Sequence, residues 1–196
     1  MGNPVLAPEE RFAYRHYRTW PKDERWELID GQAWNMSPAP GTRHQDLSGR
    51  LFLLIATYLK GKTCKVFAAP FDVLMPEADE PDDDVSTVVQ PDIVVICDRS
   101  KLDSRGARGA PDWIVEILSP STAAKDYGVK LALYRNRGVR EYWIVDHAAK
   151  VVHAWVLGED GQYCKERIYA AGDRASSAVL SGLVVDTAEL FSDLDY

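Results

Sequence analysis

The sequence predicts a single α/β domain over residues 1–196, with helices flanking a central mixed β-sheet and an N-terminal β-hairpin. Two runs, 92–97 and 113–119, are apolar on both faces, which is typical of central strands covered on both sides. Residues 43–59 have the spacing of an amphipathic helix. The order of helix, strands, helix, strands favours a mixed sheet with helices packed against it. A chain of 196 residues with 46% hydrophobic residues can build one such core.

The N-terminal half predicts a hairpin, a helix and an extended segment. Residues 24–36 form two short strands joined at Asp30-Gly31, a dipeptide typical of tight hairpin turns. Residues 65–75 are expected to be extended, with a bend or a sheet edge at Pro70. The helix at 43–59 carries its apolar side chains at helical spacing (Leu47, Leu51, Leu54, Ile55 and Tyr58).

The C-terminal half predicts a second helix between strands. Residues 98–111 form a loop between the two central runs. Residues 123–137 form a helix, with Ser121 or Thr122 as its N-cap and Gly138 as its stop. The remaining expected elements are strands at 141–146, 150–157 and 163–169 and a short helix from Thr187.

The three cysteines, Cys64, Cys97 and Cys164, are an odd number without close spacing. They lie in strand-like segments or at the end of one, so we expect buried, reduced thiols. No Cys-x-x-Cys is present and the four histidines are scattered, so the sequence gives no support for a structural zinc site.

The sequence indicates a soluble, cytoplasmic protein. The first twelve residues have no basic head followed by an apolar stretch, so we expect no secretory signal. The longest helix-like apolar run, 51–56, is far shorter than the ~20 residues of a membrane span.

A net charge of −7 argues against a nucleic-acid partner, but the distribution of charge weakens that objection. Residues 77–84 hold six acids, and without them 23 basic residues face 24 acidic ones, a balance of −1. Residues 99–140 hold nine Lys or Arg against four Asp or Glu, a balance of +5. A locally basic region can face phosphates in an acidic protein. On charge alone, an ordinary solvated surface is the better interpretation, and core packing explains the six tryptophans better than base stacking does.

Two carboxylates inside apolar strands carry the strongest chemical signal. Asp92 opens the first central run and Glu116 lies near the end of the second. If these strands are antiparallel neighbours, the two carboxylates meet. Buried carboxylates are neutralised, paired or bound to a metal, and two of them with a backbone carbonyl suit Mg²⁺ or Mn²⁺. The structural alternative is a strand-start cap for Asp92 and a salt bridge for Glu116; it is favoured for each residue singly, but not for the pair.

The helix at 123–137 offers a cation to this pair. With an apolar stripe through Ala124, Tyr127, Leu131 and Tyr134, Lys130 borders the buried face and Lys125 faces water, at 100° per residue. Asp126, one turn before Lys130, can pair with it, which is also the structural explanation of that lysine.

These residues resemble the PD-(D/E)XK nuclease superfamily, and more closely a bacterial family of hypothetical proteins labelled as restriction endonucleases. The resemblance implies a restriction-endonuclease-like core. The matching stretches span most of the chain: WELIDG (26–31), His44-Gln45, VVQPDIVVICD (88–98), PDWIVEILSPST (111–122) and KDYGVKLALYRNRGVREYWIVD (125–146).

The resemblance also implies the roles of individual residues. Asp92 and Glu116 match the two acidic motif positions, and the carbonyl of Ile117 is a further metal ligand. The superfamily lysine would stand two residues after Glu116, where this chain has Leu118, so the lysine has moved to Lys130. Glu27 is implied as an additional acid near the site, although by itself it suggests a surface residue of the hairpin. His44, at the start of a helix, is by itself a polar helix-start residue rather than a ligand.

The leading hypothesis is a Mg²⁺- or Mn²⁺-dependent endonuclease that acts on nucleic acid, with DNA the favoured substrate. The alternative is a nuclease-like fold without turnover that serves as a nucleic-acid-binding or assembly module. A homodimer is expected by analogy, because cutting both strands of a duplex commonly takes two active sites.

Overall fold

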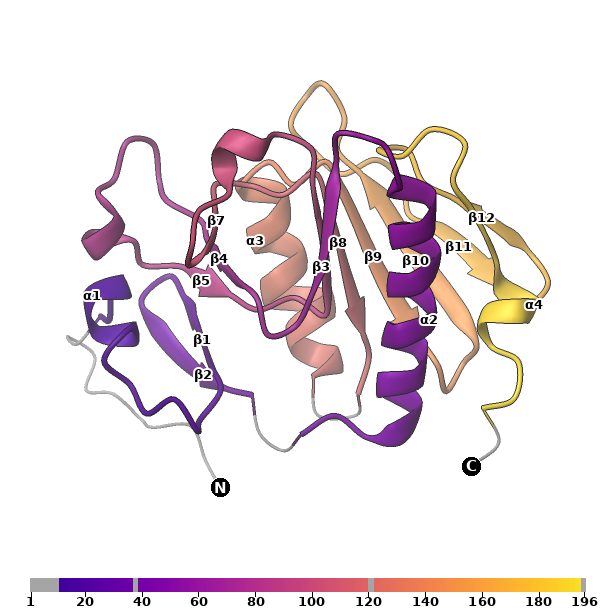
Figure 1. Ribbon diagram of the computed structural model, residues 1–196, viewed down its shortest axis with the longest axis horizontal. Helices are drawn as coiled ribbons and strands as arrows, with labels where there is room; N and C mark the ends of the chain where they lie inside the picture. The colour runs from indigo at the N-terminus through magenta and orange to yellow at the C-terminus, as the bar shows by residue number, and fades with distance from the viewer. Residues whose placement is uncertain (1–10, 37–38, 120–121, 195–196) are drawn as a thin grey trace. The chain divides into compact units, whose positions relative to one another are not determined.

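The computed structural model describes residues 11–36, 39–119 and 122–194 (Figure 1). The chain divides into two compact units, each assembled from segments that are distant in sequence. The first comprises Met1–Ala39, Phe71–Gln90 and Ser100–Gly109, and the second comprises Pro40–Pro70, Pro91–Arg99 and Ala110–Tyr196. The predicted mixed α/β class is confirmed, while a single domain over 1–196 stays a prediction.

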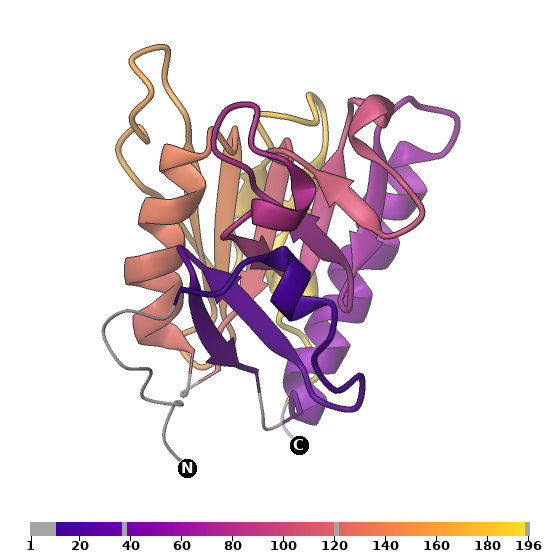
Figure 2. The same cartoon turned by 90° about the vertical axis from the view of Figure 1, so that its left-hand side faces the viewer.

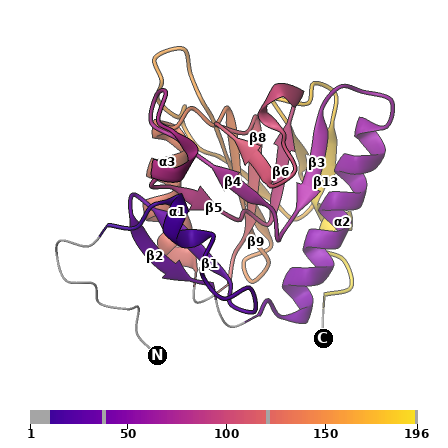
Figure 3. The same ribbon diagram turned by 60° about the vertical axis from the view of Figure 1, so that its left-hand side comes forward.

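The first unit is built on a five-stranded sheet in the order β2-β1-β5-β4-β7, in which β4 and β7 are parallel and the other pairs antiparallel (Figure 3). Its core contains Tyr14, Leu28, Leu74, Val85 and Val88. The elements are α1 (Tyr14–Tyr17), β1 (Trp26–Ile29), β2 (Gln32–Asn35), β4 (Asp72–Leu74), the 3-10 turn η1 (Asp82–Asp84), β5 (Val88–Val89) and β7 (Gly106–Arg108).

The predicted hairpin is confirmed as β1 and β2. Asp30 and Gly31 have φ values of 47° and 79°, so both turn residues adopt the left-handed conformation of a tight two-residue hairpin turn. A Cβ at position 31 would also lie 2.9 Å from Arg11 Cβ. The turn therefore requires glycine both for its conformation and for this close approach.

The second unit is built on a six-stranded sheet in the order β11-β10-β9-β8-β6-β3, and β8 and β9 are its parallel pair. Every residue of β6 and β8 is buried, so the prediction of two central strands is confirmed. The strands are β3 (Lys65–Ala68), β6 (Ile93–Ile96), β8 (Trp113–Ile117), β9 (Glu141–Asp146), β10 (Val151–Val156) and β11 (Arg167–Ala170).

Helices cover both faces of this sheet. The long helix α2 (Thr42–Leu59) buries Leu47, Leu51 and Ile55 against one face, together with α4 (Thr187–Leu190) and the ribbon of β12 (Arg174–Ser176) and β13 (Val184–Asp186). The π-helix η3 (Lys125–Lys130) and α3 (Leu131–Asn136) contact the other face, as Figure 2 shows for α3 and α2 on either side of the strands.

Three sequence expectations are refined by the described residues. The segment 65–75 is two strands in different sheets, β3 and β4, because the chain leaves one unit for the other between them. The helix predicted at 123–137 is π-helical in its first half, and its predicted stop at Gly138, whose φ is 83°, is confirmed. Thr122 stands directly before the first helical residue, as predicted for the N-cap, and its carbonyl accepts from the backbone N of Asp126 at 2.9 Å. Its hydroxyl bonds to Ser119, and Ser121 lies outside the described residues.

The prediction of buried reduced thiols is wrong. Cys64 and Cys97 form a disulfide, and Cys164 is free but exposed. The pairing follows from strand register: Lys65 lies opposite Ile96 in the antiparallel pair β3–β6, so the next position brings Cys64 opposite Cys97. Among the described residues, no helix combines the length and apolar composition needed to cross a bilayer.

Candidate active site

The strand register brings the two predicted acids together. The central strands β6 and β8 are antiparallel, with Ile93 opposite Val115 and Val94 opposite Ile114. One step further along this register, Asp92 lies opposite Glu116. Directly opposed residues of an antiparallel pair project to the same face of the sheet. The expected antiparallel opposition of Asp92 and Glu116 at one end of two central strands is therefore confirmed, and a metal site shared by the two carboxylates stays a prediction.

Asp92 has a structural role in addition to any chemical one. Its Oδ2 accepts hydrogen bonds from the backbone N of Ile117 at 2.8 Å and from His44 Nε2 at 3.0 Å. The bond to Ile117 satisfies a strand N–H opposite Pro91, which extends the ladder as a cap does. The side chain is 17% exposed, and Oδ1 accepts no hydrogen bond from the part of the chain that the structure describes. One carboxylate oxygen is thus fixed and the other is available.

His44 belongs to this site, and the sequence interpretation underrated it. It lies in the first turn of α2 and is 9% exposed. Because a carboxylate only accepts, His44 Nε2 carries the proton that it donates to Asp92. Its Nδ1 is buried without a hydrogen-bond partner in the described structure. The spacing of His44 from Leu47 and Leu51 on the buried face of α2 was the signal that could have identified it.

Glu116 and Lys130 form a buried ion pair. Lys130 Nζ lies 2.8 Å from Glu116 Oε1, and Tyr134 OH donates to the same oxygen at 2.8 Å. Asp126 Oδ1 lies 3.9 Å from Lys130 Nζ. The side chains of Lys130 and Glu116 are 2% and 5% exposed. The prediction that Lys130 reaches the acid pair is confirmed at Glu116, whereas Lys125 is half-buried rather than in solvent.

The π-helix η3 determines which side chains face Glu116. In a π-helix the hydrogen bonds join residues i and i+5, so each residue turns through less than the 100° of an α-helix. Asp126, Lys130 and Tyr134, spaced by four, are consequently all buried, while Ala124 of the predicted stripe is exposed. The prediction that Lys130 points toward the sheet is correct. The buried face of the helix, however, passes through Asp126 and Lys130 rather than through Ala124.

The surroundings of the pair are apolar and aromatic. Tyr142 is fully buried, donates to the carbonyl of Asp126 at 3.2 Å, and packs edge-on against Tyr134. Burial raises the pKa of Tyr142 well above its usual value, and the charges of Glu116 and Asp126 raise it further. Electrostatic interactions are strengthened in such a low-dielectric environment.

Glu27 lies in the first unit. It is a residue of β1 and is fully buried, and its Oε1 accepts from the backbone N of Gln90 at 3.0 Å. The expectation that Glu27 alone would be a surface residue is therefore wrong. Its role as an additional acid of the site stays a prediction.

The donors around Asp92 and Glu116 fit a hard divalent cation. Asp92 offers an available carboxylate oxygen, and Lys130 offsets only one of the two negative charges of the pair. Across the described residues there is no group of three or more His, Cys, Asp or Glu side chains arranged to hold a metal ion. A metal here would rely on two carboxylates, a backbone carbonyl such as that of Ile117, and water, which is usual for Mg²⁺.

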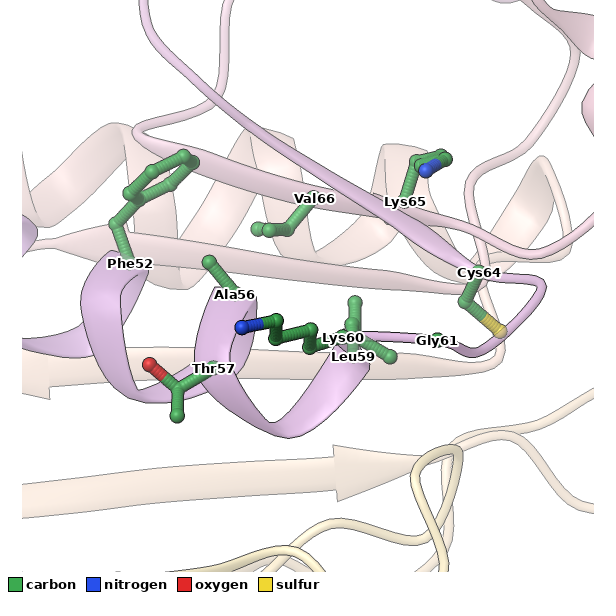
Figure 4. Close-up of a pocket in the computed structure, with 9 residues that line it drawn as sticks. All are labelled: Phe52, Ala56, Thr57, Leu59, Lys60, Gly61, Cys64, Lys65 and Val66. Atoms are coloured by element: carbon green, nitrogen blue, oxygen red, sulfur yellow. The ribbon is translucent and has the colours of Figure 1, made fainter.

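The other features considered from the sequence do not add to this site. Arg105 and Arg108 of the basic region are both in ion pairs with Asp82, as an ordinary surface predicts. A groove of about 520 Å³ between the C-terminal half of α2 and β3 is lined mostly by apolar residues, together with Thr57, Lys60 and Lys65 (Figure 4). No carboxylate lines this groove. It lies at the C-terminal end of α2, whereas His44 lies in the first turn of that helix.

Comparison with known proteins gives matches to a family model, to a protein sequence and to solved structures. The model of the Uma2 family, described as "Putative restriction endonuclease", matches residues 14–188. The "Uncharacterized protein slr1290" of Synechocystis sp. is 29% identical over 174 residues, which cover 87% of this chain and 84% of that protein. A crystal structure of a "putative nuclease belonging to DUF820" from Anabaena variabilis has a TM-score of 0.73 at 18% identity, covering 92% of this chain and 98% of that chain. At this identity the structural match shows the fold.

Proposed function

Because the chain belongs to the Uma2 family, whose description is "Putative restriction endonuclease", we propose that it is a metal-dependent endonuclease that hydrolyses phosphodiester bonds in DNA. The observation that carries this proposal is the placement of Asp92 opposite Glu116 with Lys130 bonded to Glu116. Asp92 directly precedes β6, Glu116 lies on the neighbouring strand β8, and Lys130 belongs to η3.

Asp92, Glu116 and the carbonyl of Ile117 would hold Mg²⁺ or Mn²⁺, which supplies an activated water and stabilisation of charge on the phosphoryl group. Lys130 and Tyr134 orient the Glu116 carboxylate through its Oε1. His44 positions Asp92 in the same way through Oδ2. Lys130 also places a positive charge where negative charge develops on the phosphate, and a preformed charge of this kind needs little reorganisation.

The test is cleavage of supercoiled plasmid DNA with Mg²⁺, with Mn²⁺ and with EDTA. We expect cleavage with either metal, none with EDTA, and loss of cleavage in Asp92→Asn and Glu116→Gln. Asp146→Asn is the matched control, because Asp146, the last residue of β9, accepts hydrogen bonds from the backbone N of Ala148 and Ala149 in the turn that follows. Cleavage that persists in EDTA or in both site variants would exclude the proposal. We expect the active form to be a homodimer, and light scattering of the same samples tests this.

A second candidate function is a nucleic-acid-binding or assembly module without turnover. The observation that favours it is the ion pair between Lys130 and Glu116, which already neutralises one acid of the pair. Calorimetric titration with Mn²⁺ separates the two, because an inactive module has no need to retain selective metal affinity.

A further inference from the structure

A second hollow lies entirely within the first unit. A pocket of about 490 Å³ is formed by residues of α1, of the segment after it, of β1 and β4, and by Gln90 after β5 and Arg105 before β7. This volume falls in the range of about 300–1,000 Å³ that is typical of small-molecule sites. The predicted core role is confirmed for the fully buried Trp113 and Trp143, but Trp20 and Trp26 are half-buried and line this pocket.

The wall of the pocket is aromatic. The ring of Trp20 lies 5.4 Å from that of Tyr17 and 5.6 Å from that of Trp26, centroid to centroid. Trp26 is held by a hydrogen bond from its Nε1 to Glu24 at 2.8 Å. Since the three rings support one another and are still partly open to solvent, they offer a preformed surface on which a planar ligand can stack.

The floor of the pocket presents an oriented acceptor. Asp72 Oδ1 accepts from Tyr17 OH and from Gln90 Nε2, both at 2.8 Å. Gln90 is 9% exposed, and its Oε1 accepts in turn from Arg25. Burial and the neighbouring Asp72 raise the pKa of Tyr17, so its hydroxyl remains a donor. Asp72 Oδ2 accepts no hydrogen bond from the described residues, so the network fixes one carboxylate oxygen and leaves the other for a donor on a ligand.

Three basic side chains, Arg18, Lys22 and Arg105, line the pocket together with the acids Glu24 and Asp72. Arg18 pairs with Asp83, and Arg105 pairs with Asp82 and lies 5.8 Å from the centre of the Tyr14 ring. Lys22 is exposed and forms no ion pair with the described residues. Arg18 and Arg105 are offset by their aspartate partners, so the charge of Lys22 is the one that favours a ligand with an anionic group beside its planar part.

We propose that this pocket binds one unstacked nucleobase that carries an exocyclic amino group, as a subsite for the DNA on which the proposed nuclease acts. The amino group donates to Asp72 Oδ2, the base stacks against Trp20, and its phosphate lies beside Lys22. An Asp accepting from the amino group of cytosine is a standard base contact. Stacking on an aromatic side chain supplies affinity for any base.

The test compares two pyrimidines of the same shape, deoxycytidine and deoxyuridine 5′-monophosphate, by calorimetry in EDTA. They differ at C4, which carries an amino group in cytosine and a keto oxygen in uracil, and at the adjacent N3, which is an acceptor in cytosine and an N–H donor in uracil. A keto oxygen opposite Asp72 leaves the carboxylate unsatisfied, so we expect the uridine nucleotide to bind about 5- to 100-fold more weakly. Equal affinities, or no binding of either nucleotide at 10 mM (roughly the weakest affinity of interest), would overturn the proposal.

Two substitutions separate the two contacts. Asp72→Asn retains an oxygen for Tyr17 and Gln90 and turns an amide NH₂ into the pocket, so it should reverse the preference in favour of the uridine nucleotide. Trp20→Ala should weaken the binding of both nucleotides by about 5- to 100-fold. Trp20→Phe keeps a stacking ring and should keep most of the affinity. Asp146→Asn is the control and should change neither affinity, and thermal unfolding verifies that each variant is folded. An unchanged preference in Asp72→Asn contradicts the assignment of that residue.

The outcome is independent of cleavage. Nucleotide binding in EDTA measures the pocket alone, whereas plasmid cleavage measures Asp92 and Glu116. If the protein binds the cytidine nucleotide selectively but never cuts DNA, the base-pocket proposal stands and the nuclease proposal fails. If the protein cuts DNA but does not discriminate between the two nucleotides, the nuclease proposal stands and the base-pocket proposal fails.

Discussion

Lys130 Nζ lies 2.8 Å from Glu116 Oε1, and both side chains are almost completely buried. Removing two charges from water is expensive, and replacing such a pair by apolar groups is commonly neutral or stabilising. Stability alone therefore does not account for this ion pair at the end of two central strands. A role in chemistry would account for it.

Lys130→Ala leaves Glu116 buried without its cation, so we expect a loss of about 3–5 kcal/mol in the free energy of unfolding. We also expect loss of cleavage, with Mn²⁺ affinity retained because lysine is not a ligand. Urea unfolding and calorimetry measure the two effects. The double variant Glu116→Gln, Lys130→Met removes both charges and should recover most of the stability but none of the activity.

Lys125→Ala is the matched control for Lys130, since Lys125 lies in the same helix but is half-buried rather than buried. It should retain cleavage. A normal cleavage rate in Lys130→Ala would show that the lysine assignment is wrong.

Asp92→Asn should abolish the Mn²⁺-induced rise in melting temperature and leave the stability of the metal-free protein within about 1 kcal/mol. The amide oxygen of Asn can still accept from the backbone N of Ile117, so the cap is retained. Thermal unfolding with and without Mn²⁺ measures both. A large loss of metal-free stability would make Asp92 a structural cap.

His44→Ala should lower Mn²⁺ affinity by about 10- to 100-fold, as removal of a partner that orients a metal ligand typically does. His44→Gln, whose amide NH₂ can donate to Asp92, should recover part of that affinity. Isothermal titration calorimetry measures the Mn²⁺ affinity of the wild type and of both variants. If His44→Ala binds the metal as the wild type does, His44 does not position Asp92.

The free energy of unfolding should fall as pH rises above about 10. Burial raises the pKa of Tyr142 in the folded state above its unfolded value of 10.0. The folded protein therefore holds this proton more tightly, a contribution that is complete below pH 10 and lost as the unfolded tyrosine ionises. Urea unfolding between pH 8 and 11, roughly the range around an ordinary tyrosine pKa, measures how steeply the free energy of unfolding falls with pH. This slope should be shallower in Tyr142→Phe. An equal slope in the variant would contradict the assignment to Tyr142.

The sequence predicted those parts of the fold that depend on local patterns. The turn at Asp30-Gly31, the stripe of α2 and the two apolar runs each carry their signal within a few residues. The division of 65–75 between two sheets and the short strands β5 and β7 depend on long-range pairing. A strand of two or three residues has too little pattern to be recognised.

The same distinction holds at the candidate site. Asp92 and Glu116 were identifiable because a carboxylate in an apolar run is conspicuous, and their opposition needed only an antiparallel register. The burial of Glu27 and the π-helix that turns Asp126 inward depend on tertiary packing. His44 was underrated because one polar residue at the start of a helix usually faces water.

The disulfide between Cys64 and Cys97 should stabilise the protein by about 3–4 kcal/mol, from the loop it closes in the unfolded chain. The sequence separation of the two cysteines is 33 residues. We expect dithiothreitol or Cys97→Ser to lower the melting temperature, and Cys164→Ser, which removes the exposed free thiol, to leave it unchanged. Thiol titration of the denatured, unreduced protein should find one free thiol, because two of the three cysteines are joined. Three free thiols, together with an unaltered melting temperature in Cys97→Ser, would show that the strands β3 and β6 are held by their backbone ladder and side-chain packing alone.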